Sequence, residues 1–412
     1  MKIAVIGGGA AGMMATATIN ELSPRTKIFL IEKNDSLGKK VIISGGGRCN
    51  VTTGLEDVKA VLENYPRGNK FLISTMHRFS PMAVRAWFES HGVPLKCEKD
   101  MRVFPVSNNG EDVVNTFIKI FQNSNTEILF KHAVTKIEKT EKGFQISFSD
   151  HPPIIVEKVV LALGGQAYRQ TGSNGDGYTL AESLGHTVTA LVPSLHSFIT
   201  AEKWPGTLAG MSFNKATISA DCIKPNTRTG PFLFTHSGIS GPAVFALSAL
   251  VAFNSVGQKK PLKLFIDFLP DNSIEEISET LQSIAKENPK KIFKNTLHHY
   301  LPLNLCEALC EYSKIYGNKR NGEMSKTEIG TAATLLKKVP LVAISRGSGD
   351  EFVTAGGVER KEIDPRTMES KICPGLYFAG EIMNIDGFTG GFNLQASWAT
   401  GRAVGENIAQ RA

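Results

Sequence analysis

Several features that would assign a chain quickly are missing from this sequence. No apolar run reaches the roughly eighteen residues of a transmembrane helix, so no membrane association is expected. The apolar stretch at the amino terminus breaks at Gly7, as in a buried strand and unlike a signal peptide. The six cysteines contain no C-x-x-C pair. That absence argues against a disulfide framework and a zinc site, and it favours a reducing cytoplasm.

What is present describes an ordinary globular chain. Hydrophobic residues make up 42% and charged residues 21% of the 412 positions, a length that favours roughly two or three domains. The net charge is +7, from 46 basic and 39 acidic residues. This mild excess permits anionic ligands and nucleic acid. The lysines are spread along the chain, and we interpret most of them as solvated.

Periodicity and turn signals predict one α/β domain with an insertion. The stretches "KIAVI", "AAGMMATATINEL" and "TKIFLIEK" indicate strand, helix and strand, a βαβ unit with parallel strands. Residues 70–125 look mainly helical, with Ser80 capping a helix that starts at Pro81. Residues 127–162 are typical of an antiparallel meander that returns to a buried strand.

The expected domain limits follow from a change of pattern near residue 191. A discontinuous domain of residues 1–190 and 346–412 is interrupted by an insert of residues 191–345. Within the insert we expect a β-rich part over 191–270 and 326–345 and a helical part over 271–325.

The first chemical motif is G-x-G-x-x-G directly after a strand and at the start of a helix. Gly7 makes the tight turn, Gly9 lets a pyrophosphate approach bare backbone, and Gly12 lets helix and strand pack closely. Glu32 ends the next strand, where a carboxylate accepts hydrogen bonds from a ribose. An acid there repels the 2′-phosphate of NADP, so the motif favours FAD or NAD.

A second glycine-opened helix near the chain end separates these two cofactors. The strand ending at Ala379 is followed by Gly380 and Glu381, a loop bearing Asp386, and "GGFNLQ" at a helix start. The N-terminus of such a helix stabilises the negative charge that an isoalloxazine gains on reduction. Asp386 is placed to accept from a ribityl hydroxyl. The motif therefore favours FAD.

These stretches, with "SGGGRCN", "RVFPVS", "LALGG", "TGSNGDGY" and "FTHSGISGPA", carry a resemblance over nearly the whole chain. The chain resembles the BaiN-like (YhiN-like) family of bacterial FAD-dependent flavoproteins, NAD(P)/FAD-dependent oxidoreductases with one group described as bile-acid ring reductases. The resemblance implies a glutathione-reductase-type, Rossmann-like FAD domain interrupted by an insert with a β-barrel-like part and a helical part. It supplies neither an agreed catalytic residue nor one substrate.

The stretch "VIISGGGRCNVTT" is a second glycine run that carries donors and no acidic residue. Ser44, Arg48 and Asn50 are donors for phosphate or for the polar edges of a flavin, and Arg48 suits a pyrophosphate. Cys49 has no second cysteine nearby, so a disulfide-reductase role is disfavoured. We interpret Cys49 as a small buried thiol and keep it as a minor catalytic candidate.

The other catalytic candidates are Tyr168, in the loop after "LALGG", and His236, a possible proton donor before a helix for which Ser240 is the expected N-cap. No metal site is expected. The residues expected to contact the cofactor come from all the motifs, and they are Gly7, Gly9, Ala10, Ala11, Gly12, Glu32, Lys33, Lys40, Ser44, Gly45, Gly46, Gly47, Arg48, Cys49, Asn50, Val134, Ala162, Gly164, Gly165, Gly380, Glu381, Asp386, Gly390, Gly391, Phe392, Asn393 and Leu394.

The leading hypothesis is an FAD-dependent oxidoreductase that reduces an organic small molecule, an enone or a ring C=C, with electrons from NAD(P)H. Because no second G-x-G-x-x-G follows a strand, NAD(P)H is expected to bind transiently, or the electrons come from another donor. Two alternatives stay open: an oxidase that uses oxygen, and a flavoprotein that acts on or binds RNA. A plain NAD dehydrogenase leaves both later motifs unexplained. The acceptor, the donor and the oligomeric state stay open.

Overall fold

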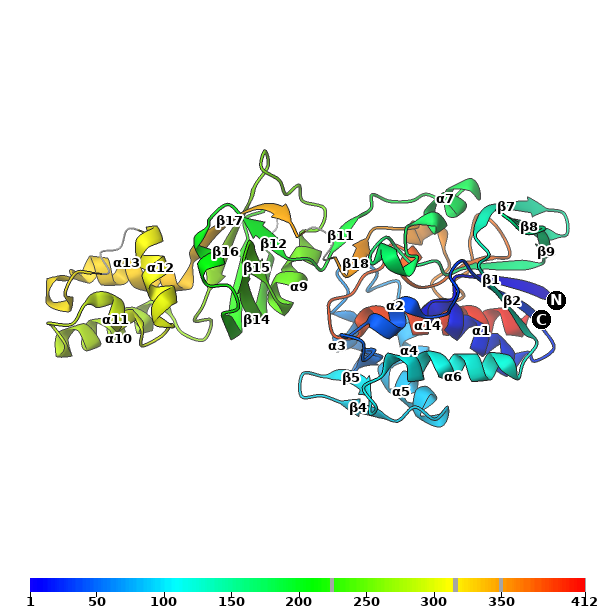
Figure 1. Ribbon diagram of the computed structural model, residues 1–412, viewed down its shortest axis with the longest axis horizontal. Helices are drawn as coiled ribbons and strands as arrows, with labels where there is room; N and C mark the ends of the chain where they lie inside the picture. The colour runs from blue at the N-terminus through cyan, green and yellow to red at the C-terminus, as the bar shows by residue number, and fades with distance from the viewer. Residues whose placement is uncertain (223–225, 314–317, 348–350, 412) are drawn as a thin grey trace. The chain divides into compact units, whose positions relative to one another are not determined.

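The computed structural model describes residues 1–222, 226–313, 318–347 and 351–411. It divides into two compact units, Met1–Ser194 with Phe352–Ala412, and Leu195–Glu351. We call them unit 1 and unit 2 (Figure 1). Both limits lie further along the chain than the expected 190–191 and 345–346. The first limit moves because β11 (Val192–Ser194) pairs antiparallel with β18 (Val353–Ala355) and so belongs to unit 1, and the second moves because Arg346 still pairs with Phe198 of unit 2.

The centre of unit 1 is a five-stranded sheet in the order β19-β10-β1-β2-β6. All four pairings are parallel, as the βαβ pattern predicts. Burial on both faces explains the near-continuous apolar runs of its inner strands. The strands are β1 (Lys2–Ile6), β2 (Lys27–Glu32), β6 (Thr126–Phe130), β10 (Lys158–Leu161) and β19 (Leu376–Phe378).

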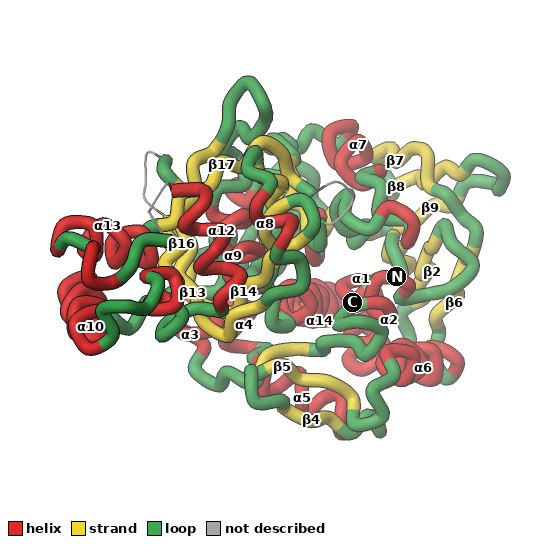
Figure 2. The backbone as a smooth tube through the Cα atoms, turned by 60° about the vertical axis from the view of Figure 1, so that its left-hand side comes forward, coloured by secondary structure: helices red, strands yellow, loops and turns green. Residues whose placement is uncertain are grey.

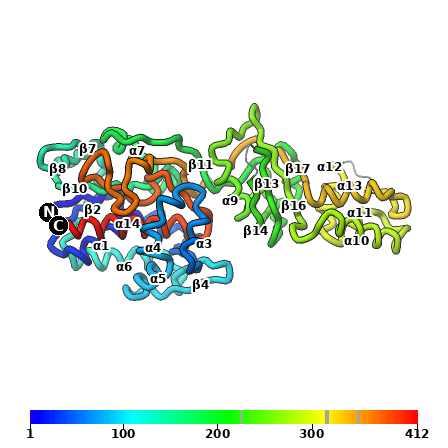
Figure 3. The backbone as a smooth tube through the Cα atoms, turned by 180° about the vertical axis from the view of Figure 1, so that it is seen from behind, coloured from blue at the N-terminus to red at the C-terminus, as the bar shows by residue number. Residues whose placement is uncertain are grey.

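Helices and a meander cover the two faces of this sheet. On one face α1 (Ala10–Leu22) packs against α6 (Gly110–Gln122) and α14 (Phe392–Gln410). On the other lies an antiparallel meander, and Figures 1 and 3 show the two layers on opposite sides. Its strands are β7 (Val134–Thr140), β8 (Gly143–Phe148) and β9 (Ile154–Val156). The meander expected over 127–162 is therefore wrong at its start, because β6 pairs with β2 in the parallel sheet.

Between β2 and β6 the chain forms a small subdomain rather than helices alone. A three-stranded sheet, β3-β5-β4, interrupts the stretch expected to be mainly helical. Ser80 caps α5 and Pro81 is its first residue, as predicted. The elements are α2 (Lys39–Ile43), β3 (Thr52–Thr53), α3 (Val58–Leu62), α4 (Ile73–Arg78), α5 (Pro81–Ser90), β4 (Leu95–Cys97) and β5 (Arg102–Pro105).

The rest of unit 1 consists of short pieces around the strand ends. They are η1 (Arg169–Thr171), α7 (Asp176–Ser183), η3 (Arg360–Glu362) and η4 (Gly380–Ile382). An aromatic cluster of Trp87, Phe88, Phe117 and Trp398 packs α5, α6 and α14 together.

Unit 2 contains a closed six-stranded barrel in the order β12-β15-β14-β13-β16-β17, drawn in yellow in Figure 2. Alternate residues of its strands point inward, and Phe198, Phe232 and Phe234 are fully buried. The barrel predicted from the family resemblance is thus confirmed. The elements are β12 (Phe198–Thr200), α8 (Trp204–Thr207), β13 (Ser212–Ala220), β14 (Asn226–Thr235), β15 (Gly238–Ser240), α9 (Pro242–Leu250), β16 (Leu262–Asp267) and β17 (Val339–Arg346).

A helical part is inserted between β16 and β17. Its elements are α10 (Ile274–Glu287), α11 (Phe293–Leu297), α12 (Leu303–Ser313), η2 (Asn321–Glu323) and α13 (Lys326–Lys337). The β-rich prediction for 326–345 is wrong over α13. Ser325 and Glu328 form a capping box, and the buried Ile329, Ala333 and Leu336 follow helical spacing.

None of the described helices is both long enough and apolar enough to span a bilayer.

Candidate functional site

The sequence motifs of unit 1 lie at one edge of the parallel sheet. The glycine turn follows β1, Glu32 ends β2, Gly164 comes soon after β10, and Gly380 comes soon after β19. These four strands are neighbours in the sheet, and their carboxyl ends share an edge. The chain passes from β1 to β2 and β6 on one side, and the later strands β10 and β19 lie on the other side of β1, so the strand order reverses at β1. This is the crevice where open α/β sheets bind ligands.

The first loop has a separate reason for each glycine. Gly7 has φ +108°, and a Cβ there would overlap the Ala162 carbonyl oxygen. A Cβ at Gly12 would overlap the Gly7 carbonyl, so α1 and the turn are in close contact. Gly9 is the N-cap of α1, and a Cβ there would meet no atom within 4 Å. This is the cradle that a pyrophosphate needs, open space before uncapped helix N–H groups.

Glu32 is nearly buried and holds the loop from the β2 side. Its Oε2 accepts from the Gly8 N–H at 2.9 Å, and its Oε1 accepts from the Asn34 backbone and side chain, both at 2.8 Å. A carboxylate has about four acceptor positions, so one on Oε2 is left for a ribose hydroxyl. The residue therefore fits the predicted role and also stabilises the turn.

The neighbouring Lys33 joins the end of β2 to the loop that precedes α7. Its Nζ lies 2.6 Å from Asp176 Oδ2 and 2.7 Å from Asn174 Oδ1. Asn34 Nδ2 donates to the Thr171 carbonyl at 3.0 Å. The "TGSNGDGY" stretch thus lies beside the ribose side of the crevice, through contacts that the sequence does not reveal.

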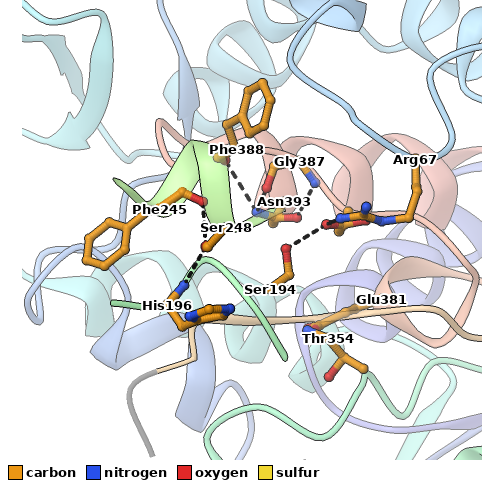
Figure 4. A network of polar contacts seen from close by, with 11 residues as sticks. Arg67, Ser194, His196, Phe245, Ser248, Thr354, Glu381, Gly387, Phe388 and Asn393 are labelled. Atoms are coloured by element: carbon orange, nitrogen blue, oxygen red, sulfur yellow. Dashed lines mark hydrogen bonds and ion pairs between the residues drawn. The ribbon is translucent and has the colours of Figure 1, made fainter. Parts of the chain in front are cut away.

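The second glycine-opened helix, α14, begins with an open N-terminus. Its N-cap, Gly391, has φ +91°, and a Cβ there would overlap the Thr52 carbonyl. Asn393 braces the preceding loop, with Oδ1 accepting from the Gly387 N–H and Nδ2 donating to the Gly387 carbonyl, both at 2.8 Å (Figure 4). No acidic residue stands in the first turn. The partial positive charge at this helix end is therefore not offset locally.

Helices α1 and α14 pack in parallel through small residues. A Cβ at Gly401 would overlap the Ala11 carbonyl, and one at Gly405 would overlap Thr18. Ala11 is the second residue of α1 and Gly401 the tenth of α14. The N-terminus of α14 therefore extends past that of α1 by about eight residues, roughly 12 Å. Two uncapped helix ends thus point the same way along one crevice.

Glu381 connects three segments between these helix ends. Its Oε2 lies 2.7 Å from Lys40 Nζ, and its Oε1 accepts from the Thr354 N–H at 2.9 Å. A Cβ at Gly165 would lie 2.8 Å from the same Oε1. The ring of Tyr168 lies 5.8 Å from Lys40 Nζ, and its backbone is left-handed with φ +58°. Lys40, Gly165 and Glu381 are therefore brought together as expected.

Asp386 occupies a different setting from the one expected. It is fully buried and forms an ion pair with Arg67, and it accepts from the Ser194 hydroxyl at 2.8 Å (Figure 4). Burial raises the pKa of Asp386, and the Arg67 guanidinium opposes that rise. Sequence reasoning missed Arg67, because a partner more than three hundred residues away leaves no local pattern. The ribityl contact of Asp386 stays a prediction.

The second glycine run is a left-handed loop. Gly45, Gly46 and Gly47 have φ between +58° and +88°, and Cys49 has φ +58°. Cβ atoms at Gly46 and Gly47 would meet nothing within 4 Å. Successive left-handed residues turn backbone N–H groups toward one side, an arrangement suited to anions.

Arg48, the expected pyrophosphate ligand, has partners of its own. Its Nη1 lies 2.7 Å from Glu98 Oε1, and its guanidinium lies 3.8 Å from the centre of the Phe104 ring. Asn50 Oδ1 accepts from the Val103 N–H at 3.2 Å, and Ser44 Oγ donates to the Val41 carbonyl at 2.7 Å. The side chains expected as donors thus hold the loop, and the Gly47 N–H donates to the Ile43 carbonyl at 3.1 Å, so the backbone of Gly45 and Gly46 is the part that fits a ligand.

Cys49 is fully buried, and burial raises the pKa of its thiol to about 12, with a hydrogen bond to Ser44 opposing the rise. A thiol with that pKa carries almost no thiolate at neutral pH. The structure therefore supports the buried, unreactive interpretation.

Ala162 also lies at this edge, with its carbonyl beside Gly7, whereas His236 and Ser240 lie in unit 2. Val134 begins β7, and Ala162 follows β10. His236 is exposed in the turn between β14 and β15. Ser240 is the last residue of β15, and Gly241 is the N-cap of α9. The prediction of Ser240 as an N-cap is wrong, because the short strand β15 reaches that position.

Comparison with known proteins gives related sequences along the whole chain. The family model described as "HI0933-like protein Rossmann domain" matches residues 1–407. A 3-dehydro-bile acid delta(4,6)-reductase of Clostridium scindens is 29% identical over 413 residues, covering 100% of this chain and 99% of the relative. A ribosomal RNA dihydrouridine synthase of Escherichia coli is also 29% identical, over 98% of this chain and 97% of the relative.

Solved structures share the fold at lower identity. An open conformation of a flavocytochrome c3 fumarate reductase superposes with a TM-score of 0.50 at 17% identity, covering 99% of this chain and 78% of that one. An Escherichia coli quinol fumarate reductase FrdA mutant has a TM-score of 0.51 at 16% identity, over 100% of this chain and 70% of that one. These similarities confirm the fold class predicted from the sequence.

Proposed function

The chain belongs to the HI0933-like Rossmann family, and from that premise we propose that it reduces a carbon–carbon double bond conjugated with a carbonyl group. The protein class is an FAD-dependent oxidoreductase, as the family resemblance in the sequence implied. When bound, FAD supplies the two-electron carrier that accepts hydride from a donor and passes it on. We propose NAD(P)H as that donor.

One observation carries the cofactor assignment: the two uncapped helix ends at one sheet edge. The open space at Gly9 fits a pyrophosphate before α1, and the free acceptor position of Glu32 fits the ribose. About 12 Å further along, the N-terminus of α14 fits an electron-rich ring edge. A dinucleotide stretched between them explains why two glycine-opened helices lie parallel.

The other proposed FAD ligands support this extended arrangement. The left-handed loop offers the backbone N–H groups of Gly45 and Gly46. Lys40 and Glu381 lie between the two helix ends and offer a cation and a carboxylate for ribityl hydroxyls. An ion pair that is only partly exposed there holds both side chains in place without a ligand.

The acceptor class rests on what the two relatives' names have in common. A 3-dehydro-bile acid with a delta(4,6) system has C=C bonds conjugated with its 3-carbonyl group. The ring of uridine has a C5=C6 bond conjugated with its C4 carbonyl group. In both, hydride adds to the carbon distant from the carbonyl and a proton adds to the adjacent carbon. We propose the same reaction type here, in which the reduced nicotinamide loses the hydride and an acid or water supplies the proton.

Because Cys49 is fully buried, the proton donor is proposed from the other two catalytic candidates. Tyr168 lies in unit 1, with its ring centre 5.8 Å from Lys40 Nζ. His236 is exposed in unit 2. Changing Tyr168→Phe and His236→Gln separates them, because loss of the proton donor lowers kcat with a solvent isotope effect and leaves flavin binding unchanged.

The first test is the visible spectrum of the purified protein before and after anaerobic addition of NADH or NADPH. We expect an oxidised flavin spectrum that bleaches with one of them and recovers on addition of a steroid enone or a uridine-containing RNA. A flavin that bleaches but recovers only with oxygen would favour the oxidase alternative. A protein that neither retains nor rebinds FAD would overturn the assignment of both helix ends.

A further inference from the structure

The helical part of unit 2 ends in a tip formed by two chain segments. Helix α10 leads away from the barrel for 14 residues, about 21 Å, and α13 packs against it on the way back to β17 (Figures 1 and 3). At the turn, residues 288–293 and 319–322 run antiparallel. The Phe293 N–H donates to the Lys319 carbonyl and the Asn321 N–H to the Lys291 carbonyl, both at 2.9 Å.

This pairing gives the tip an inner face and an outer face. Phe293 and Asn321 are buried, and Asn321 fixes the turn by donating to the Asn288 carbonyl at 2.8 Å. Ile292 and Arg320 form the bridge between the segments, so their side chains stand side by side on the outer face. The buried Asn321 thus fixes the backbone that carries the outer face.

The exposed cations of the tip differ from the lysines behind it. Lys294 is paired with Glu307, and Lys319 with Glu328. Lys286, Lys290, Lys291 and Arg320 are exposed, and the structure shows no ion pair to a described acidic residue for any of them. We call these four residues, with the exposed Ile292, the basic tip.

Two carboxylates belong to the same region and reduce its charge only in part. Glu323 accepts from the Arg320 backbone N–H at 3.1 Å, and Glu287 is within hydrogen-bond distance of the Ser283 hydroxyl, at 3.4 Å. Four cations against two anions leave a net positive end on a rigid arm. Exposed lysines and arginines of this kind bind phosphates, and an apolar side chain among them can contact a ribose or base.

We propose that the basic tip binds the phosphate backbone of structured RNA, so that the reducible base belongs to an RNA partner. The choice of RNA rests on the proposed function, because uracil is the one of its two proposed acceptor rings that is attached to a phosphate backbone. Phosphate binding by the tip stands independently of the reduction. Such binding fixes the partner without reading its sequence, and its strength falls steeply with salt.

The test compares two charge-matched triple variants of the full-length, flavin-loaded protein. Lys290→Glu, Lys291→Glu and Arg320→Glu together reverse three of the four cations of the basic tip. Lys259→Glu, Lys260→Glu and Lys263→Glu make the same charge change on exposed lysines of unit 2 outside it. Binding of a labelled mixed-sequence RNA hairpin is followed by fluorescence anisotropy over a salt series, without any electron donor.

We expect the tip variant to lose RNA affinity by roughly tenfold or more, and its salt slope to fall by about two to three. The control variant should change little, and reduction of a small steroid enone should be unaffected in both. An equal loss of RNA affinity in both variants would overturn the proposal that the basic tip binds RNA. The proposal would also fail if the original protein bound phosphatidylglycerol vesicles and did not bind RNA.

If charge reversal prevents folding, the glutamine versions of the same three tip substitutions test the same point. If the protein binds RNA through the tip but reduces neither an enone nor uridine, the proposed function is refuted and the RNA-binding proposal still holds.

Discussion

The two glycine-rich loops of unit 1 use glycine for opposite reasons. In the first, a Cβ at Gly7 or Gly12 would overlap a backbone carbonyl, so neighbouring backbone excludes a side chain. In the second, Gly46 and Gly47 have open space around them, but their φ values of +73° and +88° disfavour side chains. A run of glycines in a sequence therefore has no single meaning.

Gly9 belongs to neither class, and this makes it the most informative glycine in the molecule. Its φ of −82° suits any residue, and a Cβ there would meet nothing within 4 Å. Neither conformation nor packing requires glycine at this position. A ligand that approaches the backbone does require it, so the two loops can be compared by substitution.

The largest expected effect is that of Gly12→Ala. The added Cβ overlaps the Gly7 carbonyl, and a backbone turn cannot move aside as a side chain can. We expect unit 1 to lose about 3 kcal/mol of stability, seen as a lower Tm. The matched control is Gly330→Ala, in α13 with open space, which should raise stability by roughly 0.5–1 kcal/mol. Equal Tm values for the two variants would contradict the packing role of the first loop.

Gly9→Ala should separate folding from cofactor binding. We expect the unfolding free energy of the flavin-free protein to stay within about 0.5 kcal/mol of the original, because nothing is displaced. FAD affinity should fall roughly a hundredfold, about 2.7 kcal/mol, since the methyl group occupies the space of a pyrophosphate. Flavin content after purification and titration of the flavin-free protein measure both. Unchanged FAD affinity would remove the ligand explanation for Gly9.

A smaller effect is expected in the second loop. Gly46→Ala places a Cβ in open space but in a left-handed backbone, at a cost of about 1 kcal/mol. Gly46→Asn should recover part of that loss, because asparagine tolerates this conformation better than alanine. Thermal unfolding of the two variants tests this order. If alanine and asparagine are equivalent, conformation is not what the second loop requires.

The comparison also shows which parts of the site could be predicted from the sequence. The positions of Gly7, Gly9, Gly12 and Glu32 around the first turn could be predicted because they depend on spacing within one βαβ unit, and their contacts with a cofactor stay predictions. The parallel sheet followed from the same local pattern. Contacts between distant segments could not be predicted. Asp386 was a candidate from its motif, but its ion pair with Arg67 was not expected.

Long-range partners also changed the meaning of residues that were found. Arg48 is a typical phosphate ligand by type, yet Glu98 and Phe104 engage it. Lys40 pairs with Glu381, 341 positions away. Side-chain type predicts what a residue can bind, and only the fold decides which partner reaches it first. Helix α13 was missed for a different reason, because the β-rich expectation for residues 326–345 did not use the S-x-x-E capping pattern of Ser325 and Glu328.

The smallest expected effect concerns Cys49, whose thiol lies in the second loop. Because burial raises its pKa to about 12, the thiolate is scarce and the sulfur is inaccessible to reagents. Alkylation of the native protein at pH 8 should label the exposed Cys97 and leave Cys49 unmodified until the protein unfolds. Peptide mass spectrometry after labelling of the native and the denatured protein shows which of Cys97 and Cys49 is modified in each. Rapid native labelling of Cys49 would mean that the second loop opens. In that case its glycines would serve movement rather than a fixed left-handed turn.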